Sequence, residues 1–203
     1  MKSIEVFILL VLALAVSASN VQIRDKCPKV KPMNGYKIEQ LLGNWHLKMM
    51  SYITDDQRLD GYCYKNYHSM ENADTLRMDI EYFLPNGETF NVTQRRNIDH
   101  TRPGVYVTLE ERTHYGFLGF SYQKNVTTES TVLYIDDELE LRFACTQLDH
   151  FWYSEAEYYY YISVKNRNFD SFSKLVPLFQ QIKDIPEDLN KLQFLTNDIT
   201  CKN

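Results

Sequence analysis

The sequence lacks the motifs that mark the common enzyme classes. It has no Gly-x-Ser-x-Gly elbow, no His-Glu-x-x-His pair and no phosphate-cradling glycine loop among its 7 glycines. The cysteines form no Cys-x-x-Cys pair, which argues against a zinc site. We therefore predict no catalytic residues, no metal site and no enzymatic activity.

Positive charge and long apolar runs are also missing. The formal net charge is −5 at pH 7, and no basic stripe stands out. A mildly acidic chain has no electrostatic footprint for nucleic acid or an anionic membrane. Beyond the N-terminus no apolar run approaches the length of a membrane-spanning helix. These absences exclude a nucleic-acid partner and an integral membrane protein.

The N-terminus has the pattern of a secretory signal peptide. Lys2 precedes an apolar run from Val6 to Val16, and small residues follow up to Ala18. We predict cleavage after Ala18, leaving 19–203 as one domain with a sizeable core. The protein would then be secreted and extracellular.

Four cysteines remain in the secreted chain: Cys27, Cys63, Cys145 and Cys201. An even number in an extracellular protein predicts two disulfides, and spacing alone leaves three connectivities open. Two Asn-x-Thr sequons begin at Asn91 and Asn125. They predict N-glycosylation, which requires that both asparagines lie on the surface.

What the chain does contain is a succession of strand-like segments. Aromatic residues make up 14% of the sequence, chiefly 15 tyrosines, and tyrosine favours strands. The first strand starts at Gly43-Asn44-Trp45, where a short helical turn gives way to a period-two pattern. In 76–82, Leu, Met, Ile and Tyr alternate with charged residues, and Pro85-Asn86-Gly87 predicts the hairpin that follows.

The later segments follow the same pattern until the period changes. Strands are expected at 132–135, 139–143 and 151–164, and 124–130 is expected to be a polar loop. A helix is expected at about 171–184 and a closing strand at about 191–200. About eight antiparallel strands followed by one helix predict an all-β sandwich or closed barrel.

Three polar or aromatic clusters have plain structural interpretations. Arg95-Arg96 is expected at a solvated strand edge, and the acidic residues 136–138 in a solvated turn. The tyrosines at 158–161 alternate, so at most half of them can face the interior of a barrel. The other half would pack under the C-terminal helix.

In their order, these features resemble the lipocalins, and within them the apolipoprotein D and insect biliprotein branch. The resemblance spans Cys27 to Cys201. It rests on Cys27-Pro28-Lys29-Val30, on Gly43-x-Trp45 after a helical turn, and on Tyr160 to Arg167. The block around Val132 to Asp136 matches the family only at Asp136, and the stretch 104–129 is about ten residues longer than in relatives.

The resemblance implies an eight-stranded antiparallel up-and-down barrel with one C-terminal α-helix packed outside. It also implies the pairings Cys27–Cys145 and Cys63–Cys201. Gly43, Trp45 and Arg167 would form the barrel floor, with the Arg167 guanidinium stacked on the Trp45 ring.

The function implied is binding and transport of a small hydrophobic molecule in the barrel interior. The bound molecule would be a lipid, a retinoid, a bilin or haem, none of them required as a cofactor. Tyr64 or Tyr134 would supply the placed polar group, and His68 is the one histidine we consider as a haem ligand. The residues expected to line the site are Met49, Tyr64, Met78, Ile80, Tyr82, Phe90, Leu109, Tyr134, Leu141 and Phe143.

Two alternatives stay open. The loops 54–61, 99–103 and 124–130 would form a rim that binds another protein, as in salivary inhibitor lipocalins, and a cell-surface receptor is another open partner. A reactive Cys63 would instead suggest a prostaglandin-isomerase-like enzyme, but an even number of cysteines favours a structural disulfide at that position.

Overall fold

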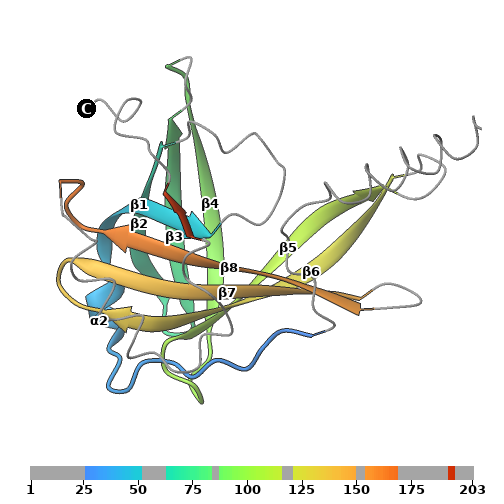
Figure 1. The fold of residues 1–203 in the computed structure, drawn as a ribbon, viewed down its shortest axis with the longest axis horizontal. Coiled ribbons are helices and arrows are strands. Elements are labelled where there is room, and N and C mark those ends of the chain that lie inside the picture. Colours follow the sequence, from blue (N-terminus) through green and yellow to red (C-terminus); the bar gives the residue numbers. More distant parts are fainter. Residues whose placement is uncertain are drawn as a thin grey trace, which may run out of the picture.

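The fold was analysed in a computed structural model that describes residues 26–51, 63–83, 87–115, 121–149, 154–168 and 192–194. Apart from one helical turn, all the regular elements in the described residues are antiparallel strands (Figure 1). The helical turn is α2 (Ile38–Leu41), and the strands are β1 (Gly43–Ser51), β2 (Cys63–Asn72), β3 (Thr75–Phe83), β4 (Thr89–Ile98), β5 (Val105–Tyr115), β6 (Ser121–Ile135), β7 (Leu139–Asp149), β8 (Ser154–Val164) and β9 (Leu192–Phe194).

The strands close into an eight-stranded barrel, as the sequence predicts. Their order is β2-β3-β4-β5-β6-β7-β8-β1-β9, and β1 also pairs with β2. Each strand from β2 to β7 pairs with the next one in the chain, so these neighbours are joined as hairpins. Strand β9 adds to the outer end of β1 through the pair Met49–Phe194.

One end of the barrel is closed by the stretch that opens β1. Strand β1 begins at Gly43, whose φ of +99° lies in a region that L side chains avoid. Two residues later Trp45 is fully buried, and its Nε1–H donates to the Leu41 carbonyl at 2.7 Å. The indole packs in a closed-end cluster with Leu41, Leu76, Tyr106, Val132 and Ile135.

The cation over the Trp45 ring is Lys165, not the predicted Arg167. The Lys165 Nζ lies 4.9 Å from the ring centroid. Arg167 instead donates from Nε to His46 Nδ1 at 3.1 Å. His46 pairs with Val164 on the face opposite Trp45, so the prediction for Arg167 was wrong. Lys165 comes directly after β8, which ends at Val164.

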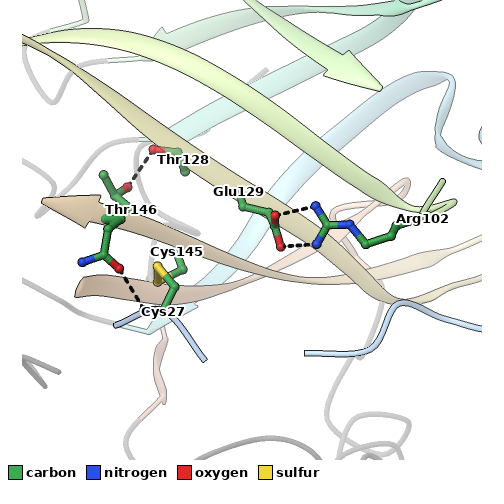
Figure 2. Close-up of a disulfide and its surroundings, with 7 residues drawn as sticks. Cys27, Arg102, Thr128, Glu129, Cys145 and Thr146 are labelled. Atoms are coloured by element: carbon green, nitrogen blue, oxygen red, sulfur yellow. Dashed lines mark hydrogen bonds and ion pairs between the residues drawn. A yellow bond between two sulfur atoms is a disulfide. The ribbon is translucent and has the colours of Figure 1, made fainter. Parts of the chain in front are cut away.

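An N-terminal arm covers the outside of β6 and β7. The disulfide Cys27–Cys145 anchors this arm to β7 with a Cα–Cα distance of 5.9 Å, which confirms the first predicted pairing (Figure 2). Further along, Met33 N–H donates to the Val132 carbonyl at 2.9 Å. The arm residue Val30 packs against a buried outer cluster formed by Leu133, Leu139, Leu141, Phe143, Cys145, Ala156, Tyr158, Tyr160, Ile162 and Val164.

The long segment after β4 forms one hairpin that extends beyond the rest of the sheet. Strands β5 and β6 pair from Val105–Thr131 to Tyr115–Ser121, so 124–130 is strand and not the predicted loop. Strand β4 pairs with β5 only at Asn97–Val107 and Ile98–Tyr106. Figure 1 shows the two strands diverging beyond that point.

The loop 99–103 lies at the closed end, and not at the rim as the protein-binding alternative assumed. It precedes Gly104, whose Cα faces the Tyr36 ring, and Gly104 O accepts a hydrogen bond from Val132 N at 2.8 Å. Arg102 binds Glu129 through two N–H donors at 3.0 and 2.7 Å (Figure 2).

The acidic turn 136–138 is as predicted, with Asp137 and Glu138 exposed.

Several predictions concern residues outside the described ranges. These are the signal peptide 1–18, the helix 171–184, the closing strand beyond Phe194, the loop 54–61 and the pairing Cys63–Cys201. Within the ranges that are described, no helix is long and apolar enough to cross a membrane.

We predict that mapping of peptides from the unreduced protein recovers Cys27–Cys145 together with Cys63–Cys201. The first bond is set by the arm on β7, and the second would use the two remaining cysteines. A peptide joining Cys27 to Cys63 would contradict both the second pairing and the placement of the arm.

We expect Trp45→Ala to lower the free energy of unfolding by about 3–5 kcal/mol, because it empties the fully buried closed end. The matched control is Tyr67→Ala on the outer face, whose side chain is 48% exposed and should cost within about 0.5 kcal/mol. Urea denaturation of both variants measures the difference. Equal stability of the Trp45 variant and the parent would show that the ring does not close the barrel.

Candidate functional site

The buried Trp45 identifies the inner face of the barrel. It pairs with Asn66 on β2, which pairs with Ile80 on β3, which pairs with Val92 on β4. Residues directly opposite one another in an antiparallel sheet point to the same side. On β4 the inner face therefore carries Phe90, Val92, Gln94 and Arg96, and on β3 it carries Leu76, Met78, Ile80 and Tyr82.

Exposure along the inner face of β4 shows which end is open. Phe90 is 44% exposed, Val92 37% and Arg96 only 7%. The inward residues of β3 follow the same trend, from half-buried Tyr82 to fully buried Leu76. The interior is thus accessible to solvent at the Phe90 end and sealed at the Trp45 end.

Four of the predicted lining residues lie on this inner face: Met78, Ile80, Tyr82 and Phe90. The Tyr82 and Phe90 rings stack with centroids 4.6 Å apart, which leaves an aromatic pair at the open end. From β8, Tyr159 and Tyr161 also face inward, whereas Tyr158 and Tyr160 belong to the outer cluster. That division matches the alternation predicted for the tyrosine segment.

Four other predicted lining residues face outward, so their assignment was wrong. Leu109 lies on the outer face of β5 opposite Thr127 and is 65% exposed. Leu141 and Phe143 are buried in the outer cluster. Tyr134 packs against the same cluster and donates its hydroxyl to Asp136 Oδ2 at 2.8 Å.

The physical reason is that both faces of β7 are buried. Leu139, Leu141 and Phe143 alternate with Glu140, Arg142 and Ala144, and the sequence suggests that the apolar set is inside. The arm supplies a second apolar environment on the outside, so the polar set takes the interior.

For Met49 and Tyr64 only the backbone is described: they pair with Ile162 and Tyr82.

The closed half of the interior is polar as a result. Arg142 donates from Nε and Nη2 to Glu140 Oε1, and both side chains are at most 4% exposed. Tyr36 and Tyr106 share a hydrogen bond between their hydroxyls, and burial raises the pKa of both. Burial also raises the pKa of the Glu140 carboxyl, and the charge of the Arg96 guanidinium opposes that rise.

Three inward side chains in the same region have polar atoms without partners in the described part of the chain. They are Asn66 Oδ1, both ring nitrogens of His68, and Nε and Nη1 of Arg96. These residues are 5%, 1% and 7% exposed, respectively. Burial, reinforced by the charge of Arg96, lowers the pKa of His68 to about 3. His68 is therefore neutral at physiological pH, so one of its ring nitrogens can donate a hydrogen bond and the other can accept one.

The structure is similar to several solved barrels. Insecticyanin from the tobacco hornworm Manduca sexta has 16% identity and a TM-score of 0.60, covering 85% of this chain and 87% of that one. The amine-binding protein of Rhodnius prolixus, solved with tryptamine, has 14% identity and a TM-score of 0.58, covering 84% and 86%. Apocrustacyanin C1 has 12% identity and a TM-score of 0.59, covering 88% and 92%.

The chain has the lipocalin fold. No model of a protein family matches the sequence, and no curated protein sequence matches it either. At 12–16% sequence identity, the likeness to these solved structures shows a shared fold and nothing about the ligand. The sequence also resembles the apolipoprotein D and insect biliprotein branch. The structural likeness supports the lipocalin fold and does not distinguish that branch from others.

The outer face of the lipocalin barrel carries both sequons. Asn91 and Asn125 are exposed on β4 and β6, which glycosylation requires. Asn91 borders a hollow of about 470 Å³ on the outer face of β1 to β4. In that hollow Thr93 donates its hydroxyl to Asp79 at 2.6 Å. Occupancy of the two sites stays a prediction.

Metal ligands do not gather anywhere in the described residues. No group of three or more His, Cys, Asp or Glu side chains is placed to hold an ion there. In the described residues the interior of the lipocalin barrel thus combines an open half with an aliphatic and aromatic lining and a closed half that contains both the apolar Trp45 cluster and buried polar groups.

We predict that acid weakens the fold through His68. Its pKa is about 3 in the folded state and about 6.5 unfolded, so between these values the unfolded chain binds the extra proton. Stability is therefore lost as the pH falls from about 6.5, by about 2 kcal/mol at about pH 5.

Urea denaturation at neutral and acidic pH measures this loss, and His68→Leu should remove it. The control His100→Leu changes an exposed imidazole and should keep the full dependence of the parent. An undiminished acid loss in His68→Leu would show that another group is responsible.

Proposed function

We propose that the protein is a secreted carrier that holds a single small apolar molecule inside the barrel. The observation that carries the proposal is the exposure gradient on the inner face, from Phe90 at 44% to Arg96 at 7%. A barrel filled by its own side chains would bury both. An interior open at one end and sealed at the other is the arrangement of a binding pocket.

The lining of the open half suits an apolar guest. Ile80 and Met78 are buried beside Val92, and the stacked pair Tyr82–Phe90 lies next to the open end. Methionine adapts to ligands of different shape because its side chain is unbranched and polarizable. Tyr159 and Tyr161, whose rings meet edge to face at 4.7 Å, add aromatic surface from β8.

Two further features support carriage rather than catalysis. Solved barrels of this fold include a biogenic amine-binding protein and a tryptamine complex. In the described residues the buried polar groups form no nucleophile–base pair of the kind that covalent catalysis uses. Cargo such as a bilin, haem or a lipid would then be bound and released unchanged.

Secretion is part of the proposal. The Cys27–Cys145 disulfide is typical of proteins from oxidising compartments, and the segment 1–18 has the composition of a signal peptide. The exposed sequons Asn91 and Asn125 fit the same route. The alternative of a protein-binding rim loses support, because 99–103 lies at the closed end and 124–130 is strand.

We expect Ile80→Asp to abolish retention of an apolar fluorescent probe, because it places a charge in the apolar part of the interior. Glu81→Ala is the matched control: it is the next residue on β3 and faces outward, so binding should stay within about twofold of the parent. Trp45, at the closed end, offers an intrinsic fluorescence signal for the titration.

The parent should also retain at least one member of a panel of fatty acids, retinoids, bilins and haem. Circular dichroism of each variant separates loss of binding from loss of fold. Failure of the parent to bind any of these above background would refute the carrier function, as would a folded Ile80→Asp variant that binds equally well.

A further inference from the structure

Arg96 is an unusual residue for the interior of a carrier of apolar molecules. It is 93% buried, being 7% exposed, yet Nε and Nη1 have no partner in the described residues. Within the described ranges its only hydrogen bond runs from Nη2 to Gln94 Oε1 at 3.4 Å, which is long. Guanidinium donors buried without partners carry a large desolvation cost. A bound group that accepts them would remove that cost.

The guanidinium lies among groups from across the barrel. Its charge acts on His68 of β2, Tyr82 of β3, Tyr106 of β5 and Glu140 of β7. Of these only Glu140 is a carboxylate, and Arg142 already donates two hydrogen bonds to it. The described residues thus place two guanidiniums and one carboxylate in the closed half of the interior.

Two more unsatisfied side chains lie on the inner face of β2, and the charge of Arg96 acts on one of them, His68. Asn66 and His68 are separated by one residue on the inner face of β2, and each has a polar atom without a partner in the described residues. His68 can donate from one ring nitrogen, and the orientation of the Asn66 amide decides whether it donates or accepts. Arg96, His68 and Asn66 therefore offer several hydrogen-bond donors to one region.

The position of this cluster relative to the apolar lining defines the shape of a guest. On β4 the inner face runs from Phe90 and Val92 through Gln94 to Arg96. A molecule that enters from the open end would meet aromatic and aliphatic side chains first and the charged group last. The inward Glu110, half-buried near Tyr82, would repel an acid left at the open end.

We infer that the cargo is an amphipathic organic acid, whose carboxylate binds Arg96, His68 and Asn66 while its apolar body lies along Ile80, Val92 and Phe90. This rests on the proposed carrier function and specifies its ligand class. Since Nη2 has a second N–H, one edge of the guanidinium can present two parallel donors to a carboxylate. A neutral hydroxyl in the same place could accept a hydrogen bond, but it would supply neither the second oxygen nor the negative charge of a carboxylate.

The test compares dodecanoate with dodecanol, which share an apolar chain and differ in the head group. Both are titrated at neutral pH into the full secreted chain with its disulfides intact, by calorimetry. The parent should bind the acid at least about tenfold more tightly than the alcohol. Arg96→Met should lower acid affinity by about tenfold to a hundredfold and leave alcohol affinity within about threefold.

Arg95→Met is the matched control, because Arg95 is the preceding residue, faces outward and pairs with Glu71. It should bind both ligands as the parent does. Arg96→Lys keeps the charge without the two-donor edge and should lose part of the preference for the acid. If Arg96→Met fails to fold, Arg96→Lys tests the proposal on its own.

The outcomes separate the two proposals. Equal affinity of the parent for acid and alcohol, or an Arg96→Lys or Arg96→Met variant that keeps the full preference, would overturn the assignment of an acidic ligand and leave the carrier function standing. A parent that binds neither ligand, nor any member of the wider panel, would overturn both.

Discussion

Closure of the sheet by β1 is the constraint on which the rest of this structure depends. Because β1 pairs with β2 on one side and β8 on the other, eight strands share a single interior. Every inward side chain then competes for one volume, and Trp45 occupies its closed end. The apolar residues that do not fit inside need another environment. The arm anchored at Cys27 provides it on the outside of β7.

The strands could be predicted from sequence, but the face that each strand turns inward could be predicted only in part. Alternation placed Met78 and Ile80 correctly because charged residues occupy the other side of β3, and only one face can be buried. On β7 the same reasoning misassigned Leu141 and Phe143, since the arm buries the second face as well. Alternation measures the difference between two faces, and it does not identify the inner one when both are covered.

The polar cluster was overlooked for a related reason. Arg95 and Arg96 read together as a solvated pair, yet adjacent strand residues point in opposite directions. Counting pairs back from the predicted turn at Pro85-Asn86-Gly87 would have put Arg96 opposite Leu76, on the inner face.

The cation over Trp45 is a different case. Arg167 and Lys165 are both near the end of β8, and only the three-dimensional path of the chain distinguishes them.

The disulfide has a consequence beyond fixing the arm. Cys27 and Cys145 are 118 residues apart, so the bond ties the start of the described chain to the wall of the finished barrel. In a reducing environment the arm would keep only non-covalent attachments, such as the hydrogen bonds from Cys27 N to Gln147 and from Met33 N to Val132. The cover that Cys27 and Val30 provide for the outer cluster around Phe143 and Tyr160 would then be less firmly held. Exposed apolar surface of this kind promotes self-association. Reduction of this one bond is therefore expected to favour self-association as well as to lower conformational stability.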